Sequence, residues 1–148
     1  LIDVTNSTHL GTRRSRISID ELAKIIMDIP NFDERLSCGD PGLINELAKS
    51  NGKINLFSFA SKYCLYHNKE VYGRDDYSIF DSVVAETLPH YVHGLSAAKI
   101  DSWRSNFDYK AFADCIQMIL DEYGIDIPNR RRKFDLFLWY ANRKKQIL

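Results

Sequence analysis

The sequence contains no long apolar run and no segment of the kind that directs export. None of its 148 residues belongs to an apolar stretch that approaches the roughly 20 residues needed to cross a bilayer. A basic segment followed by an apolar one, as in a secretory signal, is also missing. We therefore expect a cytoplasmic protein with no membrane partner. The first residue is Leu1 rather than Met, so we expect a fragment of a longer chain or a trimmed one.

Cysteine is scarce, and its pattern favours neither disulfides nor a metal centre. Cys38, Cys64 and Cys115 are odd in number and widely spaced, which is more typical of reduced thiols in a cytoplasmic protein. Cys64-x-x-His67 and His90-x-x-His93 place pairs of zinc-binding residue types on one helical face. Their separation is typical of no zinc module, so a core cysteine and stacked or surface histidines are favoured, and no metal is predicted.

Several catalytic motifs are missing as well. The sequence has no glycine-rich phosphate loop, no G-x-S-x-G and no H-E-x-x-H. Nucleotide hydrolysis, serine hydrolase and zinc protease activities therefore have no support, and no cofactor is indicated.

Helix signals are present along most of the chain. A content of 45% hydrophobic and 27% charged residues is ordinary for a globular protein, and the length favours one domain over residues 1–148. Capping residues and apolar periodicity predict helices near residues 18–29, 40–51, 56–67, 81–88, 96–103, 108–123 and 129–141. Either Asp81 or Ser78 can cap the fourth of these, and residues 33–36 can form a short helical turn. We find no convincing strand or repeat. The sequence thus predicts an all-α single domain of six or seven helices, with residues 1–16 partly irregular.

Three of these helices carry specific expectations about burial. The first should present Ile19, with its neighbours Leu22, Ala23, Ile26 and Ile29, on one apolar face. The helix after Asn55 leaves only Ser58, Ser61, Lys62 and Leu65 off a broad apolar arc, so protein should surround most of it. The last helix, KFDLFLWYA, is apolar most of the way round, so its middle should also be buried.

The net charge of zero hides an asymmetry between the termini and the middle. Residues 129–148 carry seven Lys or Arg against Asp135, residues 1–16 carry a net +2, and residues 17–128 carry −8. Basic termini on an acidic body indicate either an anion-binding face, with phosphate the obvious ligand, or simply well-solvated helices.

The basic run at the start of the last helix supplies the nucleic-acid-binding candidates Arg130, Arg131, Arg132 and Lys133. A helix N-terminus disfavours cations, so an anion is expected nearby unless these side chains are merely solvated. Arg74, in the loop before residue 81, either contacts substrate or has no role.

The main candidates for chemistry are Lys62 and Asp81. An amine is a nucleophile only when neutral, and Lys62 lies on an otherwise apolar helix beside two small serines that leave room for a ligand. Asp81 should lie at the N-terminus of a helix, where backbone N–H groups keep a carboxylate ionised. Such a pair has the parts needed to displace a base from deoxyribose, through attack at C1′ and stabilisation of the cationic sugar.

The stretch around these two residues resembles the helix-hairpin-helix DNA glycosylases, in particular the 8-oxoguanine DNA glycosylase branch. It is also similar to short uncharacterised bacterial proteins with an F-S-F-A-S-K-Y-C core. The resemblance covers about 35 residues and rests on the nineteen-residue spacing of Lys62 and Asp81. Ser58 and Ala60 stand where the family has the glycines of its hairpin. The resemblance implies a reduced helix-hairpin-helix fold and a base-lesion glycosylase or lyase acting on DNA.

Lys62 and Asp81 can also be interpreted as structural residues without a catalytic role. Lys62 would then lay its stem on Tyr66 with its amine in water, and Asp81 would be only an N-cap. The protein would in that case be a non-catalytic helical module that binds nucleic acid or another protein.

Overall fold

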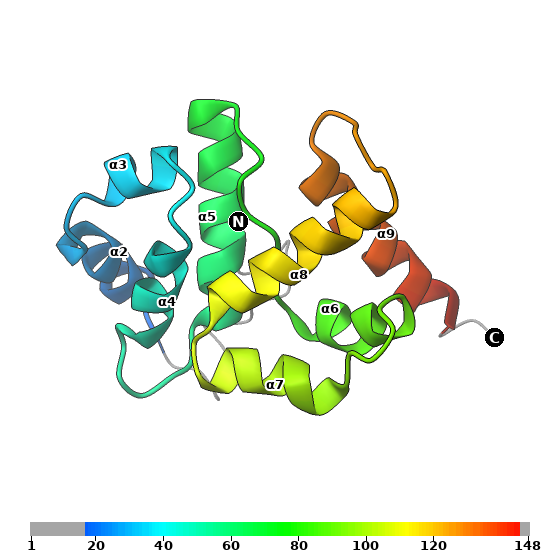
Figure 1. The fold of residues 1–148 in the computed structure, drawn as a ribbon. Helices are drawn as coiled ribbons and strands as arrows, with labels where there is room; N and C mark the ends of the chain where they lie inside the picture. Colours follow the sequence, from blue (N-terminus) through cyan, green and yellow to red (C-terminus); the bar gives the residue numbers. More distant parts are fainter. Residues whose placement is uncertain (1–16, 146–148) are drawn as a thin grey trace.

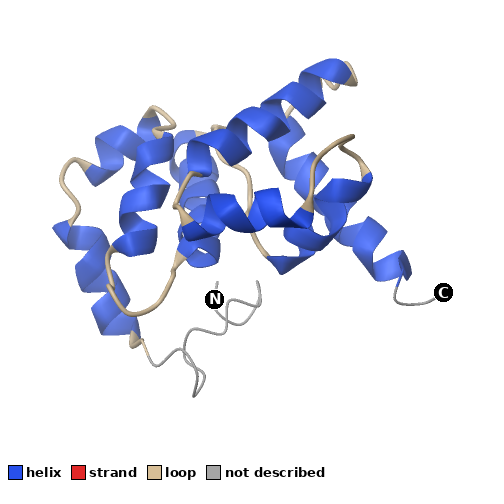
Figure 2. Cartoon of the chain, turned by 60° about the horizontal axis from the view of Figure 1, so that its bottom comes forward, coloured by secondary structure: helices blue, strands red, loops and turns tan. Residues whose placement is uncertain are grey.

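The computed structural model describes residues 17–145, and this range contains helices and connecting segments without any strand (Figure 2). The predicted all-α class is therefore confirmed, with eight α-helices in this range rather than six or seven. In chain order the elements are α2 (Ile19–Asp28), α3 (Phe32–Ser37), α4 (Pro41–Lys49), α5 (Phe57–Tyr72), α6 (Ser82–Thr87), the 3₁₀ helix η1 (Leu88–His90), α7 (Ala97–Ser105), α8 (Tyr109–Glu122) and α9 (Arg130–Lys145). The expected irregularity of residues 1–16 lies outside the described residues.

Polar side chains begin most of these helices at the predicted positions. A side-chain oxygen immediately before the helix accepts a hydrogen bond from a backbone N–H in the first turn, which satisfies one of the unpaired donors there. This holds for Ser18, Asp40, Asp81, Ser96 and Asp108. The helix starts could thus be read from local sequence.

The end of α5 was predicted wrongly. We expected it to stop near His67, but it continues to Tyr72, and Gly73 ends it with a φ of 65°. Asn68, which suggested a loop, is buried within the helix. Its amide donates to the carbonyl of Leu36 and to the carboxylate of Asp76, each at 2.9 Å. These tertiary contacts outweigh the weak helix preference of Asn68, and the next two residues, Lys69 and Glu70, are good helix formers.

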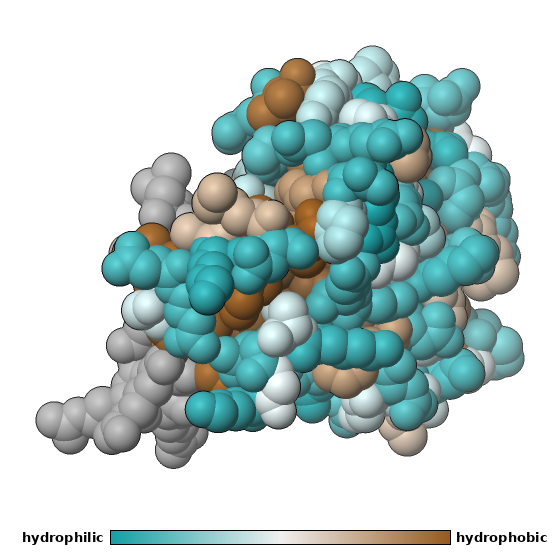
Figure 3. All heavy atoms as spheres, turned by 90° about the vertical axis from the view of Figure 1, so that its left-hand side faces the viewer, coloured by the Kyte–Doolittle hydropathy of each residue, from teal (hydrophilic) through white to brown (hydrophobic). Residues whose placement is uncertain are grey.

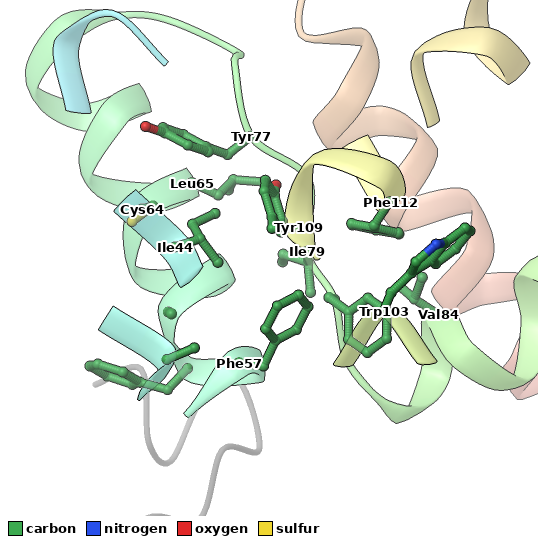
Figure 4. Close-up of a cluster of buried hydrophobic side chains, with 14 of the residues drawn as sticks. Ile44, Phe57, Cys64, Leu65, Tyr77, Ile79, Val84, Trp103, Tyr109 and Phe112 are labelled. Atoms are coloured by element: carbon green, nitrogen blue, oxygen red, sulfur yellow. The ribbon is translucent and has the colours of Figure 1, made fainter. Parts of the chain in front are cut away.

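The helices surround one core centred on α5. Figure 1 shows α5 with α2, α3 and α4 on one side and α6, α7 and α9 on the other, and α8 runs from beside the lower part of α5 towards α9. Figure 4 shows how Phe57, Tyr109, Phe112 and Trp103 converge between α5, α7 and α8. Phe80 joins this cluster edge-to-face, with ring centroids 5.0 Å from both Phe57 and Phe112. The cluster fixes the segment that leads into α6 against α5.

Burial of the central helix follows the prediction. Of its residues, Ser61, Lys62 and Leu65 are buried together with most of the apolar arc. The narrow polar face of α5 is therefore covered by protein, as expected.

The apolar face predicted for the first helix is only partly covered by protein. Ile19 is 84% exposed, although Leu22 and Ile26 do pack on the core and Ile29 is buried. Figure 3, which faces the side of the molecule that carries α2, shows a largely hydrophilic surface interrupted by apolar atoms. An α-helix turns about 100° per residue, so a single row of core contacts leaves its outermost apolar positions in solvent.

In α9 other parts of the protein bury only one face of the helix, although the sequence predicted that its middle would be buried. Phe134, Asp135 and Leu138 are buried, whereas four large apolar side chains are 40–62% exposed: Leu136, Phe137, Trp139 and Tyr140. Figure 1 places α9 at the edge of the bundle, where α6 and α8 contact it from within and no described helix covers its outer side. The described residues contain no helix with the length and apolar character required for a membrane span.

Candidate functional site

Lys62 and Asp81 meet in the structure. The Lys62 Nζ atom lies 3.1 Å from Asp81 Oδ2, and their side chains are 5% and 19% exposed. The structural interpretation required the Lys62 amine to extend into bulk water, and it does not. Asp81 does serve as the N-cap of α6, since Oδ1 accepts from the Val84 N–H at 3.1 Å. One carboxylate thus caps the helix with one oxygen and contacts the amine with the other.

Ser61 fixes α5 against the segment that leads into α6. Its hydroxyl accepts from the Phe80 N–H at 3.0 Å and lies 3.3 Å from the Phe80 carbonyl oxygen. Ser61 precedes Lys62 and Phe80 precedes Asp81, so the contact between Ser61 and Phe80 brings the amine and the carboxylate close together. We had expected Ser61 to leave room for a ligand, but it is buried and used for this contact.

A cavity of about 590 Å³ opens beside the ion pair. Its wall combines charged, aromatic and small side chains from α5, α6, α7, α9 and the segment before α6. These residues are Ser58, Lys62, Tyr66, Ile79, Asp81, Ser82, Val83, Val84, Arg104, Arg132, Asp135, Leu136 and Trp139. Amine and carboxylate are therefore both accessible from one cavity.

Arg132 connects the basic run of α9 to this cavity, a connection that sequence spacing did not predict. Its guanidinium donates to the Tyr66 hydroxyl at 3.0 Å and stacks over the Tyr66 ring at 5.2 Å. It also lies 3.7 Å from Asp135.

The anion expected at the start of α9 is a carboxylate of the chain itself. Asp75 accepts from the backbone N–H groups of Arg131 and Arg132, at 2.9 and 3.3 Å. It therefore occupies the place that a phosphate was expected to take.

The other nucleic-acid-binding candidates are spread over the surface. Arg130 lies 2.9 Å from Asp121, and Arg131 donates to Gln117 at 2.7 Å. Arg74 is half-exposed and pairs with Asp76. Lys133 is exposed and lines a different, apolar groove between α8 and α9. The structure thus brings Arg132 alone among these candidates into the cavity.

Asp135 is the residue of this cavity that sequence reasoning missed. Its carboxyl is 7% exposed, and Oδ2 accepts from the Ile79 N–H at 3.4 Å. Burial raises the pKa of Asp135 well above the ordinary value, and this effect outweighs the opposing charge of Arg132. The available signal was an acid inside an apolar helical run, which breaks the pattern of that helix.

The cysteine and histidine pairs do not form a metal site. Cys64 is buried, and desolvation raises the pKa of its thiol. His67 stacks on Tyr63 and lies 3.2 Å from its hydroxyl. Among residues 17–145 no cluster of three or more potential ligands of the His, Cys, Asp or Glu type occurs.

Comparison with known proteins gives relatives without an assigned activity. The HI_0787_N family, described as an N-terminal domain, matches residues 1–71, a range that includes Lys62 and ends before Asp81. An uncharacterised protein of Haemophilus influenzae is 30% identical over 132 residues, which is 86% of this chain. The chain spans 58% of the length of that relative. No solved structure matches the chain.

Proposed function

We propose that the protein is a DNA glycosylase or lyase-like enzyme that removes a damaged base, such as 8-oxoguanine, with Lys62 as nucleophile. Asp81 either accepts the proton of the amine or, as a carboxylate, stabilises the cationic sugar. The observation that carries the proposal is the 3.1 Å contact between Lys62 Nζ and Asp81 Oδ2 in the wall of a 590 Å³ cavity. The proposed fold is a reduced helix-hairpin-helix glycosylase fold.

The contact suits an amine nucleophile because the acceptor of its proton is already in place. Lys62 becomes nucleophilic once one ammonium proton passes to Asp81, and its free electron pair then attacks C1′. Low exposure of both groups keeps bulk water away from the reacting atoms.

The size and lining of the cavity suit a nucleotide turned out of the helix. Small-molecule sites occupy about 300–1,000 Å³, and 590 Å³ lies within this range. Enzymes that act on a base rotate it into such a pocket and stack it on aromatic side chains. Tyr66 and Trp139 supply aromatic rings in the wall.

Positive charge for the DNA backbone is available at the cavity and beyond it. Arg104 lines the cavity and its side chain is 56% exposed, so its charge reaches solvent. Lys133 and Arg143 are exposed on α9, and Arg143 stacks over Trp139 at 3.8 Å. These cations, rather than the internally bonded Arg130 and Arg131, are the proposed phosphate contacts, and Arg74 is the remaining candidate.

Borohydride trapping tests the proposal. The protein is incubated with duplex DNA that carries an abasic site or a single 8-oxoguanine, and the Schiff base is reduced to a stable adduct. Wild-type protein and Lys69→Gln, a control on the same helix outside the cavity, should form the adduct, and Lys62→Gln should not. DNA binding measured by fluorescence anisotropy should survive in Lys62→Gln and weaken steeply with salt. An adduct of equal yield in Lys62→Gln would refute the role of this lysine.

A second candidate function is favoured by the exposed side of α9. Large apolar side chains that face solvent mark interaction surfaces in many proteins. Leu136, Phe137, Trp139 and Tyr140 are of this kind. In the second function the protein is a non-catalytic binding module, and the Lys62–Asp81 pair serves only to hold α5 against α6. Wild-type protein that forms no adduct with either DNA would favour this function.

A further inference from the structure

A second carboxyl group faces the cavity that holds Lys62 and Asp81. Asp135 reaches it from α9, whereas Lys62 comes from α5 and Asp81 from the start of α6. The Ile79 N–H and the Arg132 guanidinium, at 3.4 and 3.7 Å, both lie nearest to Oδ2. A proton on this carboxyl group therefore belongs on Oδ1.

The surroundings of Asp135 favour its neutral form. Its side chain is almost completely buried, between the buried Phe134 and Leu138 of the same helix, and charged groups lose hydration in such a place. The Arg132 guanidinium opposes this effect, but it is 3.7 Å away and also bonds to Tyr66. The carboxylates of Asp81 and Asp75 add repulsion. The titratable and charged groups that act on Asp135 or line the same cavity are the cations Arg132, Lys62 and Arg104, the acids Asp81 and Asp75, and the phenols Tyr66 and Tyr109.

We propose that Asp135 is the third catalytic group of this site and protonates the base as it leaves the sugar. This inference rests on the function proposed above. It assigns complementary roles to two carboxyl groups in one cavity: Asp81 takes a proton from the nucleophile, and Asp135 gives one to the leaving group. Enzymes that separate the roles of two carboxyl groups do so by giving them different environments.

The step balances without any further reactant. One ammonium proton passes from Lys62 to Asp81. The Nζ electron pair then forms a bond to C1′, the bond between C1′ and the base nitrogen breaks, and its electrons stay on the base. The Asp135 proton moves to the base, which leaves neutral. A secondary ammonium on C1′ and an Asp135 carboxylate remain, so the total charge is unchanged.

The inference also defines the class of substrate. The base must offer an acceptor, either a ring nitrogen or an exocyclic oxygen, within reach of the Asp135 carboxyl. An abasic sugar has no base to protonate, and the oxygen lost from its C1′ leaves as water with the proton that Asp81 has taken from Lys62. Asp135 is therefore required for base removal and dispensable for capture of an abasic site.

This difference gives the experiment. Single-turnover removal of 8-oxoguanine from a duplex and borohydride trapping on a preformed abasic site are measured for wild type and Asp135→Asn. Removal should fall about 10²-fold or more, the usual contribution of a general acid, whereas trapping should stay within about twofold. Asp114→Asn, an exposed acid on α8, is the control and should change neither rate. Equal rates of base removal in wild type and Asp135→Asn, or an equal loss in both assays, would overturn the inference.

The pH profile of the wild type supplies a second readout that needs no variant. Base removal should slow as pH rises and Asp135 loses its proton, and this limb should be missing from abasic-site trapping. Profiles of the same shape would refute the inference even if Asp135→Asn failed to fold. Wild-type protein that traps no abasic DNA would instead refute the proposed function itself, so the two failures are distinguishable.

Discussion

The protonation of Asp135 can be tested through stability alone, without any substrate. Asp135→Asn replaces the carboxyl with a neutral group of the same shape that can still accept from the Ile79 N–H. Because burial raises the pKa of Asp135, the wild type folds with a proton on this group at pH values where the unfolded chain has lost it. The asparagine variant has no such proton to keep.

The sign and size of the effect follow from proton linkage. Between the ordinary value of 3.8 and the higher pKa of the folded state, the folded wild type binds one more proton than the unfolded chain. The stabilising contribution of this group is therefore complete below 3.8 and is lost as pH rises, by at most about 1.4 kcal/mol per pH unit. Asp76 and Asp121, whose pKa values are lowered, act in the opposite direction, but they are present in both proteins and cancel in the difference.

Urea denaturation followed by circular dichroism at 222 nm measures this difference. Unfolding free energies of wild type, Asp135→Asn and the exposed control Asp114→Asn are compared at pH 4, 5, 6 and 7. The advantage of Asp135→Asn over wild type should grow with pH up to the pKa of the folded state and then level off, while Asp114→Asn should follow the wild type. A difference that stays constant, or one that shifts against Asp135→Asn as pH rises, would mean that Asp135 is ionised and paired with Arg132. Its proposed role as an acid would then fail.

Two further predictions concern Asn68 and Gly39, which both contact Asp76 in the segment between α5 and α6. Asn68→Ala should lower the free energy of unfolding by about 2–3 kcal/mol in urea denaturation, because it removes the buried amide that donates to the Leu36 carbonyl and to the Asp76 carboxylate and accepts from the Asp76 N–H. A loss below about 0.5 kcal/mol would show that water replaces the amide. Gly39→Ala should be more destabilising than Gly52→Ala by thermal denaturation. Both glycines have φ near +70°, which costs about 1–2 kcal/mol for alanine, but only at Gly39 does an added Cβ lie 2.7 Å from the Asp76 side chain. Equal losses would mean that this contact relaxes freely.

Local signals in the sequence predicted most of the fold. N-caps, glycine C-caps and apolar periodicity depend on neighbours within one or two helical turns, so Asp40, Asp81 and Asp108 could be placed from the sequence. The continuation of α5 past Asn68 depends on α3 and on the loop that follows α5, which the sequence does not place. Burial of α9 was overestimated for a related reason, because an apolar helix at the edge of a bundle has partners on one side only.

Half of the candidate site was predictable in the same way. The pairing of Lys62 with Asp81 could be proposed because both belong to one stretch of 20 residues in which helix signals are clear. Arg132 and Asp135 come from a helix about 50 residues further on, and their place in the cavity depends on how α9 packs against α6. The interpretation of the basic run as a phosphate site did not anticipate that Asp75 would take the anion position.

The sequence overestimated the burial of α9 and did not identify Asp135 as a site residue. Both errors concern how apolar and acidic residues are distributed around this helix, and this distribution bears on function. A helix covered on a single side needs apolar residues mainly along that strip, yet α9 places Asp135 within the strip and leaves Trp139 and Tyr140 in solvent. A leucine in place of the acid would avoid the cost of burying a carboxyl group, but it would leave the Ile79 N–H without this acceptor. Departures of this kind from the local rules concentrate at functional sites, where stability is given up for chemistry. The buried Asp135 lies in the same cavity as Lys62, the only buried lysine in the described part of the chain. The presence of both groups in one cavity favours a catalytic role for it over a purely structural one.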